Sequence, residues 1–327
     1  MNQPAETLHL PSNAKFVHPD VTAKGEQRAS VPLDRLETVW FNTGTLCNIT
    51  CSNCYIESSP SNDRLVYLTT GEVAALLDEI VREGYGTSEI GFTGGEPFMN
   101  PEFLDILGAA LERGFEVLVL TNAMQPLQRP SIKRGLLHLK GEHGARLRLR
   151  VSLDHFTPEL HEAERGARTW AKALAGLDWL NANGFAIAIA GRTCWNETEA
   201  DERSGYAALI ASRGWRIDPA DPKQLMLLPE MDGSHDVPEI TTACWGILHK
   251  SPREMMCAKS RMVVKRKGAP TPVVVPCTLL PYEAAFEMGA TFAEAASADS
   301  GMFSKGAVKL CHPHCAKFCV LGGGSCS

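Results

Sequence analysis

From Thr38 to Leu228, short β-rich runs alternate with helical stretches, and this alternation limits the possible folds more than any other feature of the sequence. Strands that alternate with helices are typical of parallel strands joined by right-handed crossovers. Six such units fit into this range, fewer than the eight of a closed barrel. The sequence therefore predicts an α/β fold, a partial (β/α)6 barrel. The expected strands are residues 38–42, 89–92, 116–120, 147–153, 185–190 and 224–228.

The chain divides into three expected parts. Residues 1–36 lack periodicity and are expected to form an N-terminal extension packed on the surface. Residues 37–243 would form the partial barrel. After them the alternation stops and cysteines accumulate, so residues 244–327 are expected to form a small C-terminal domain. Within that domain, residues 262–264 and 273–275 are expected to pair as a hairpin.

Composition excludes several classes of protein. The chain has 327 residues and a net charge of −6, and this acidic balance disfavours a nucleic-acid partner, which wants a basic surface. No apolar run reaches the roughly 18 residues that a membrane-spanning helix needs. The polar N-terminus lacks the features of a secretory signal. We therefore expect a cytoplasmic protein without a membrane partner.

The chain contains eleven cysteines, and their distribution is uneven. Three lie close together, the next follows after a long gap, and seven lie in the last third of the chain. A disulfide scaffold would spread them more evenly, whereas in a reducing cytosol clustered cysteines favour metal ligation. We therefore interpret most of them as ligands.

The first three cysteines form a CxxxCxxC motif in the loop after the first expected strand, at Cys47, Cys51 and Cys54. Three thiolates at this spacing can hold one face of a [4Fe-4S] cluster and leave the fourth iron open for a ligand. A structural zinc site would need a fourth ligand nearby, and the nearest upstream histidine, His18, is distant in sequence. The motif therefore favours an open cluster.

Other polar or small residues follow the later strands. Gly94–Glu96 come after the second strand, Asn122 after the third, Asp154 after the fourth and Cys194 after the fifth. In barrel-like α/β folds, chemistry gathers at the carboxyl ends of the strands. We therefore expect these residues to surround one site.

Together, CxxxCxxC and the later Gly94-Gly95-Glu96-Pro97 resemble the radical S-adenosylmethionine (SAM) superfamily, and the resemblance covers roughly residues 37–327. Further segments resemble the later strand ends of that family. They are Leu120-Thr121-Asn122, Val151-Ser152-Leu153-Asp154, His161 to Gly166, and Leu227-Leu228-Pro229-Glu230.

The resemblance implies an activity. The open iron would bind the amino and carboxylate groups of SAM, and an electron from a reductant such as flavodoxin or ferredoxin would cleave SAM to a 5′-deoxyadenosyl radical that abstracts hydrogen from a C–H bond. The family commonly has an aromatic residue before the third cysteine, where this chain has Asn53, followed by Tyr55 after the cysteine. The residues implied to bind SAM are Tyr55, Gly94, Gly95, Glu96, Pro97, Asn122, Ser152 and Arg165.

The C-terminal cysteines resemble the SPASM or twitch extensions of radical SAM enzymes, which hold auxiliary iron–sulfur clusters. A single auxiliary cluster would take Cys257, Cys277 and two tail cysteines. Two clusters would use the four tail cysteines for one, and Cys244, Cys257 and Cys277 for the other. The alternative is a zinc knuckle of Cys311, His312, His314, Cys315 and Cys319. The full tail set is Cys311, Cys315, Cys319 and Cys326.

Three further residues are candidates for catalysis. Cys194 could donate a hydrogen atom to a substrate radical, although a free cysteine is often simply a small buried residue. Cys244 has the same two interpretations, with a ligand role as a third. Asp154 could act as a general base, although a carboxylate at a strand end is more often held by hydrogen bonds.

Three functions remain possible. The favoured one is an enzyme that oxidises, epimerises or rearranges a C–H centre of a small-molecule substrate. The alternative is a maturase that modifies a peptide or protein side chain. Such maturases often carry a recognition domain of about 80 residues, and only about 36 residues precede the first strand here. The third, a non-catalytic iron–sulfur electron carrier, would have no need of the Gly-Gly-Glu-Pro motif.

Overall fold

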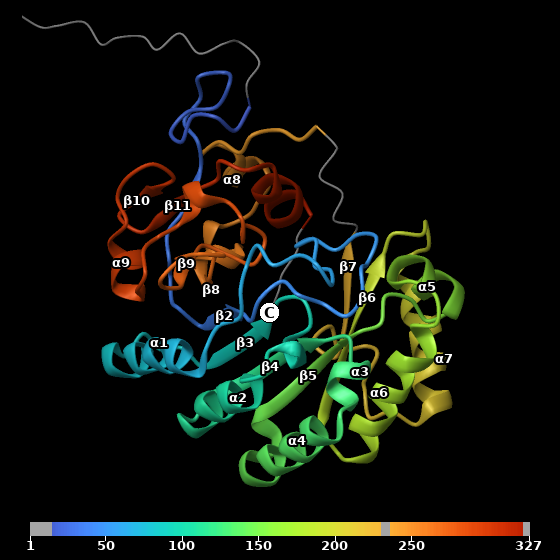
Figure 1. Ribbon diagram of the computed structural model, residues 1–327. Coiled ribbons are helices and arrows are strands. Elements are labelled where there is room, and N and C mark those ends of the chain that lie inside the picture. Colours follow the sequence, from blue (N-terminus) through green and yellow to red (C-terminus); the bar gives the residue numbers. More distant parts are fainter. Residues whose placement is uncertain (1–14, 230–235, 323–327) are drawn as a thin grey trace, which may run out of the picture.

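The computed structural model describes residues 15–229 and 236–322 (Figure 1). Glu230 and Cys326, both named above, lie outside these residues. Among the described helices, none is long and apolar enough to cross a bilayer.

The centre of the molecule is an eight-stranded sheet in the order β7-β6-β5-β4-β3-β2-β8-β9. Strands β2 to β7 are parallel, and each pairs with its neighbour in the sequence. The six predicted strands are therefore confirmed, and with them the open α/β barrel. Their bounds are β2 Thr38–Asn42, β3 Glu89–Thr93, β4 Glu116–Thr121, β5 Leu147–Ser152, β6 Ala186–Thr193 and β7 Leu225–Pro229.

The C-terminal region extends this sheet. Strand β8 (Ser260–Val264) pairs in parallel with β2, and β9 (Val273–Val275) pairs antiparallel with β8. The predicted hairpin is thus present, but it continues the barrel sheet rather than standing apart from it. Because β8 begins only two residues after Ala258 and Ser260 pairs with Thr38, the segment around Cys257 lies at the amino end of β8, next to the amino end of β2.

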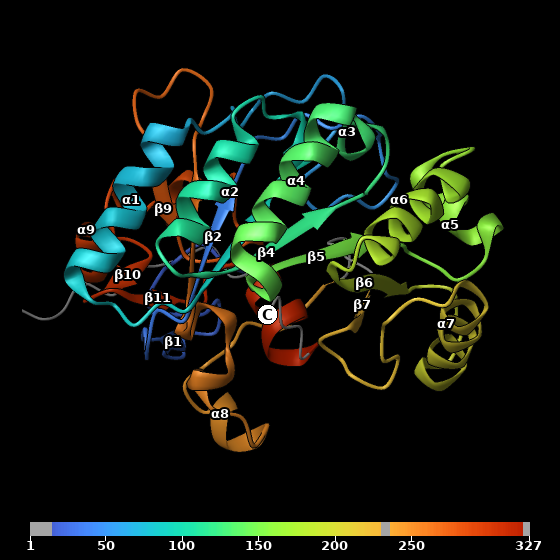
Figure 2. The same cartoon turned by 90° about the horizontal axis from the view of Figure 1, so that it is seen from below.

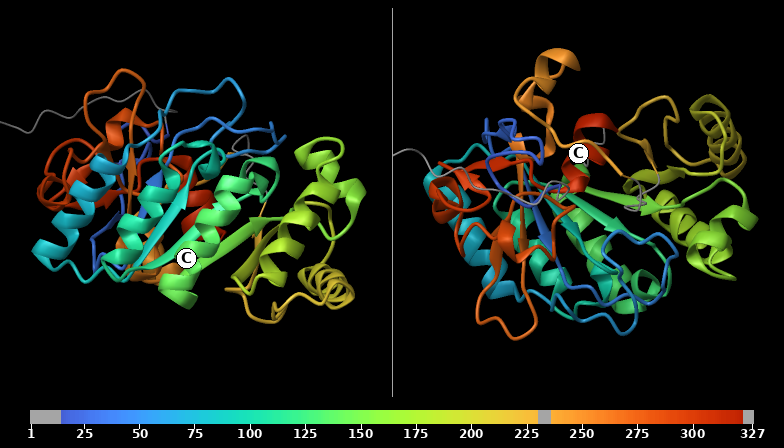
Figure 3. Two further views of the ribbon diagram at one scale, coloured as in Figure 1. Left: turned by 60° about the horizontal axis from the view of Figure 1, so that its bottom comes forward. Right: turned by 90° about the horizontal axis from the view of Figure 1, so that it is seen from above.

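Helices cover the outer face of the curved sheet, whereas the C-terminal π-helix Cys315–Leu321 lies on the inner side (Figures 2 and 3). Helix α1 starts with a capping box in which Thr69 and Glu72 satisfy each other's main-chain N–H groups. The outer helices are α1 Thr70–Glu83, α2 Phe103–Glu112, α3 Gln125–Gln128, α4 Pro130–His143, α5 Pro158–Arg165, α6 Trp170–Ala182 and α7 Glu199–Arg213.

Side chains alternate between the two faces of the strands. Val117 and Val119 of β4 pack in the outer core under the helices, whereas Leu118 joins a smaller inner cluster with Trp40 and Met262. This period of two is the normal geometry of a strand. The inner face therefore carries the residues that can reach a site inside the barrel.

The N-terminal segment pairs and packs with the C-terminal region. Strand β1 (Ser30–Val31) pairs with β11 (Ala307–Lys309), which pairs with β10 (Phe303–Ser304). Ala29 and Val31 are fully buried, so this part of the segment does not lie on the surface as expected. A buried ion pair of 2.5 Å between Arg28 and Glu239 holds it. The short helices α8 Cys244–Ile247 and α9 Phe292–Ser297 complete the region.

Candidate active site and cysteine sites

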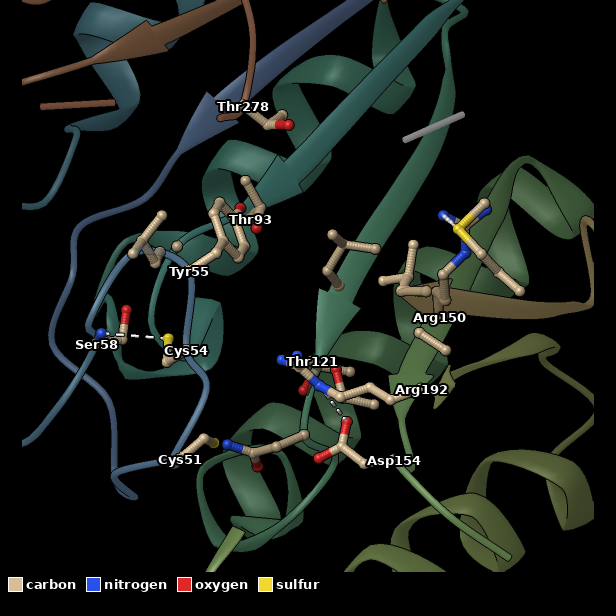
Figure 4. A pocket seen from close by; sticks show the side chains of 18 of the residues that line it. Cys51, Cys54, Tyr55, Ser58, Thr93, Thr121, Arg150, Asp154, Arg192 and Thr278 are labelled. Carbon is tan, nitrogen blue, oxygen red and sulfur yellow. Dashed lines mark hydrogen bonds and ion pairs between the residues drawn. The ribbon is translucent and has the colours of Figure 1, made fainter. Parts of the chain in front are cut away.

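A cavity opens on the inner side of the sheet at the carboxyl ends of the parallel strands (Figure 4). The CxxxCxxC loop lies on one side of it, and Asp154 and Arg192 lie on the other. The sequence predictions that meet at this cavity are Cys47, Cys51, Cys54, Tyr55, Gly94, Gly95, Asn122, Ser152, Asp154 and Arg165.

The three thiols of the loop are close enough to influence one another. Burial is the main reason that the pKa of Cys47 is raised to about 12, with nearby Glu96, Cys51 and Cys54 adding to the rise and one main-chain hydrogen bond opposing it. Burial also raises the pKa of Cys51, although Arg165 opposes that effect. Thiols whose pKa values are raised by burial, as at Cys47 and Cys51, fit a site in which a cationic iron cluster would supply the missing positive charge.

The cysteine set fits a cluster better than a preformed site for one ion. Within residues 15–229 and 236–322, no three His, Cys, Asp or Glu side chains converge on a single metal position. The three loop cysteines nevertheless line the same cavity. Cys54 Sγ accepts a hydrogen bond of 3.3 Å from the Ser58 main-chain N–H, and Asn122 Nδ2 lies 3.9 Å from Cys47 Sγ. Hydrogen bonds to ligand sulfurs are a normal part of iron–sulfur sites.

The two glycines of the Gly-Gly-Glu-Pro motif allow the cysteine loop to approach β3. A Cβ on Gly95 would lie 2.1 Å from the Leu46 carbonyl oxygen, and one on Gly94 would lie 2.4 Å from that of Gly44. Gly94 also has a φ of 139°, which favours glycine. The Gly95 N–H donates to the Gly44 carbonyl at 2.8 Å. The glycines therefore fix the start of the CxxxCxxC loop.

The Glu96 carboxylate faces the end of β4 rather than the cavity. It accepts hydrogen bonds of 2.8 Å from both Thr121 Oγ1 and the Asn122 N–H, and it caps the short turn at Pro97. Burial raises its pKa to about 7 against these bonds. Neither Glu96 nor Pro97 lines the cavity, so the structure does not place these two residues where they were expected to bind SAM.

Asn53 also differs from the expected arrangement. Its side chain does not line the cavity but donates from Nδ2 to Glu164 at 2.9 Å. Tyr55 does line the cavity, one residue after the third cysteine. An aromatic ring is therefore present near the loop, on the other side of Cys54 from the position where the family resemblance would place it.

Asp154 is the centre of a buried charge network. Arg165 contacts its carboxylate at 2.5 Å and Arg192 at 3.4 Å. Burial alone would raise the pKa of Asp154, but the two guanidinium groups outweigh this and hold it below its usual range. A carboxylate that stays ionised beside two arginines is a weak general base, so the geometry favours a role as their counter-ion.

Sequence reasoning missed several residues of the cavity. Arg150 and Arg192 come from inward positions of β5 and β6, and Met226 comes from β7. The alternation of side chains along a strand could have identified Arg192, because it lies two residues after Ala190 and therefore points to the same face of β6. Tertiary placement was needed to see that the C-terminal region also contributes Met256, Thr278, Leu279 and Phe318.

Neither Cys194 nor Cys244 lines this cavity. Cys194 follows the end of β6, and Cys244 Sγ accepts a hydrogen bond of 3.3 Å from the Thr241 N–H at the start of α8. The structure therefore does not bring either thiol to the place where a hydrogen-atom donor would act.

Four tail-region cysteines surround a second, smaller cavity. Cys257, Cys277, Cys315 and Cys319 all line it, together with apolar residues. Burial raises the pKa of Cys257 to about 11 and those of Cys277 and Cys315 well above the usual range. Neighbouring thiols, Cys319 first among them, also raise the pKa values of Cys277 and Cys315. This group matches the single-cluster arrangement, with Cys315 and Cys319 as the two tail cysteines.

Cys311 is close enough to Cys315 to raise the pKa of that thiol, but it is held differently from the other four cysteines. Its thiol donates to the His18 carbonyl at 3.4 Å, and it does not line the second cavity. The His314 ring contacts the Leu279 carbonyl at 3.2 Å. The zinc knuckle and the two-cluster arrangement both need Cys311, so the described geometry supports neither. The fourth tail cysteine, Cys326, lies outside the described residues.

A thin wall separates the two cavities. Met256, Thr278 and Phe318 line the first cavity, and each directly adjoins a cysteine of the second. Met256 lines both cavities, and Thr278 Oγ1 lies 3.6 Å from its sulfur. A molecule bound in the first cavity would therefore lie between the CxxxCxxC loop and the second group of cysteines.

Comparisons with known proteins agree with this arrangement. Residues 41–202 match the Radical SAM superfamily. The subtilosin biosynthesis protein AlbA of Bacillus subtilis is 27% identical over 171 residues, covering 52% of this chain and 35% of that protein. The mycofactocin maturase MftC of Mycobacterium ulcerans is 31% identical over 148 residues, covering 43% and 36%. The chain thus spans about a third of the length of these relatives.

Solved structures share the fold. Streptococcus suis SuiB bound to S-adenosylmethionine superposes with a TM-score of 0.59 at 11% identity, covering 84% of this chain and 67% of that one. The enzyme anSMEcpe with bound AdoMet gives 0.58 at 14% identity, covering 80% of each chain. These structures show the shared fold alone. The match of residues 41–202 to the family model, together with the CxxxCxxC loop and the Gly-Gly-Glu-Pro motif that the fold brings into contact, shows that the chain belongs to the radical SAM superfamily.

Proposed function

We propose that this radical SAM enzyme modifies a side chain of a peptide, and that the modified residue enters the cavity between the two cysteine groups. The observation that carries the proposal is the position of this cavity. Its walls come both from the strand ends of the barrel and from the residues beside Cys257, Cys277 and Cys319. A substrate there can contact both halves of the molecule.

The relatives favour a peptide over the small-molecule substrate that the sequence suggested. AlbA is named for bacteriocin biosynthesis and MftC for mycofactocin maturation, and they match 52% and 43% of this chain. GTP 3′,8-cyclases also match, at 27% identity over 188 residues for that of Microcystis aeruginosa. A small-molecule substrate is therefore the second candidate.

The residues of this chain have separate roles in the proposed reaction. Cys47, Cys51 and Cys54 would hold a [4Fe-4S] cluster, and Asn122, Ser152 and Tyr55 lie where they can contact bound SAM. When bound, this cluster supplies the electron that cleaves SAM to the radical that removes hydrogen from the substrate. Apolar wall residues such as Met256, Leu279 and Phe318 exclude water from that radical.

The second group of cysteines would hold one auxiliary cluster. Cys257, Cys277, Cys315 and Cys319 provide four thiols, enough to ligate a [4Fe-4S] cluster without an open iron. The nearest cavity residues adjoin these ligands, so such a cluster would lie beside the bound substrate. A flavodoxin or ferredoxin as the reductant stays a prediction.

The test starts from anaerobically reconstituted protein with SAM and a chemical reductant. We expect slow release of 5′-deoxyadenosine without substrate, and none from a variant with Cys47, Cys51 and Cys54 all replaced by Ala. Peptides encoded beside the gene are then compared with GTP. A peptide that accelerates release and changes in mass supports the proposal. Acceleration by GTP, with no peptide changing in mass, overturns the peptide assignment but not the radical SAM chemistry.

A further inference from the structure

The two residues between Cys51 and Cys54 are held by the end of helix α5. The Asn53 N–H donates to Glu164 Oε1 at 2.9 Å, and Asn53 Nδ2 donates to Glu164 Oε2 at 2.9 Å. The Ser52 N–H donates to the Glu164 main-chain carbonyl at 2.8 Å. One residue thus accepts three hydrogen bonds from the middle of the cysteine loop.

This contact is buried and its charge is balanced. Glu164 is only 4% exposed, so its hydrogen bonds are little weakened by water. Arg192 lies 3.9 Å from the Glu164 carboxylate and donates from Nη2 to the Asn53 carbonyl at 3.0 Å. The main-chain N–H, the main-chain carbonyl and the side-chain amide of Asn53 are therefore all engaged by α5 and β6.

The position of this contact has a consequence for the neighbouring thiols. Cys51 and Cys54 flank the clamped pair, so a shift of Ser52 or Asn53 would move both sulfurs. Hydrogen bonds to an ionised carboxylate are roughly twice as strong as neutral ones. The adjacent residue, Arg165, is tied to Asp154, so the end of α5 is itself fixed to the barrel. The cysteine loop is thus attached to a part of the fold that is itself held in place.

We propose that Glu164 is a positioning residue for the CxxxCxxC loop, acting through Asn53 to keep the sulfurs of Cys51 and Cys54 in place for the iron cluster. The proposal rests on the radical SAM chemistry but not on the identity of the substrate. It needs no contact between Glu164 and SAM, since neither Glu164 nor Asn53 lines the cavity.

The test exchanges the hydrogen-bond donor and acceptor between the side chains of Asn53 and Glu164. Asn53→Asp places two carboxylates against each other and should be disruptive. Adding Glu164→Gln to it restores a donor opposite the new carboxylate and leaves the net charge of the pair unchanged. Glu164→Gln alone should be tolerated, because the Asn53 amide can turn over and accept from the glutamine. Glu159→Gln, exposed on the same helix, is the matched control.

The readouts are the rate at which a chelator removes iron from the reconstituted protein and the change in the EPR spectrum of the reduced protein on adding SAM. We expect Asn53→Asp to lose iron about tenfold faster, as the loss of one charge-assisted hydrogen bond implies, and to lose the SAM-dependent EPR change. The double variant and Glu164→Gln should stay within about threefold of the wild type and keep that change.

A double variant no better than Asn53→Asp would overturn the proposal, as would an Asn53→Asp protein that behaves like Glu159→Gln. The experiment can also be interpreted if a variant fails to fold. If Asn53→Asp is misfolded and the double variant is folded, the pair is coupled as proposed. If both are misfolded, Glu164 serves the fold of the barrel and the positioning role is wrong.

Discussion

Tyr282 donates a hydrogen bond from its hydroxyl to the main-chain carbonyl of Ile56, with an O–O distance of 2.6 Å. Ile56 lies two residues after the third cysteine of the CxxxCxxC loop, and Tyr282 lies five residues after Cys277. Asn62 Nδ2 donates to the same hydroxyl at 3.2 Å, and the Arg64 guanidinium stacks 3.7 Å from the centre of the ring. The C-terminal region therefore holds the loop just after Cys54, whereas Glu164 holds it between Cys51 and Cys54.

We expect Tyr282→Phe to loosen the loop while keeping the stacked ring. The loss of one partly buried hydrogen bond costs about 1 kcal/mol, which corresponds to about fivefold faster local opening. Hydrogen exchange of the segment after Cys54, followed by mass spectrometry, measures this. Tyr85→Phe removes a hydroxyl that lies outside the loop and should leave its exchange unchanged. Equal exchange in both variants would show that the brace has no effect.

The close approach of the CxxxCxxC loop to Gly95, just after β3, predicts that a larger residue at this position lowers the iron content. Gly95→Ala would place its Cβ 2.1 Å from the Leu46 carbonyl oxygen, so the main chain just before Cys47 would have to move. We expect the variant to keep its secondary structure by circular dichroism but to bind about four irons fewer per chain, as loss of one [4Fe-4S] cluster requires.

Gly141→Ala is its control. Gly141 lies within helix α4 with nothing within 4 Å of an added Cβ, so the change should stabilise the helix by up to about 1 kcal/mol. It should not alter the iron content. A Gly95→Ala protein with full iron would mean that the loop tolerates displacement from β3.

The tail cysteines allow a matched comparison. Cys315 lines the second cavity, whereas Cys311 bonds to the His18 carbonyl. The reconstituted wild type should hold well over four irons per chain, and Cys315→Ala should lower this by up to about four. Cys311→Ala should retain the full content. Similar losses from both variants would contradict the assignment of four ligands, and zinc in place of the extra iron would favour the knuckle.

The order of the strands could be predicted from the sequence because it depends on local patterns. Each of the first five runs from Thr38 onward is followed by a helix, and right-handed crossovers then dictate a parallel sheet. The CxxxCxxC loop and Gly95 were found in the same way, because short motifs carry their own chemistry.

Pairings between distant residues could not be predicted. Strand β8 extends the sheet at β2, although more than two hundred residues separate them. Asn53 and Glu164 are 111 residues apart, and nothing in either local sequence specifies the partner. The same holds for the division of the tail, in which Cys257 and Cys277 line one small cavity with Cys315, whereas Cys311 does not line it. Such contacts depend on tertiary packing, which outweighs local pattern where two segments meet.

His161 predicts how stability depends on pH. The side chain is fully buried against Trp170, and neither ring nitrogen has a hydrogen-bond partner among the described residues. Burial, helped by Arg165 and opposed by Asp154, lowers the pKa of His161 from 6.5 to about 4. The folded protein therefore binds fewer protons than the unfolded chain between these values, so the contribution of His161 is complete above pH 6.5 and is lost as the pH falls toward 4.

A pKa lowered from 6.5 to about 4 corresponds to about 3 kcal/mol of stability lost over that range. His161→Leu replaces the ring with an apolar side chain of similar size that cannot take up a proton. We expect urea denaturation of this variant to show a shallower loss of stability between pH 6.5 and 4 than the wild type. His138→Gln, an exposed position on α4, should leave the slope unchanged. A variant with the wild-type slope would mean that other groups govern the acid sensitivity, because burial without a partner is what makes protonation of His161 costly.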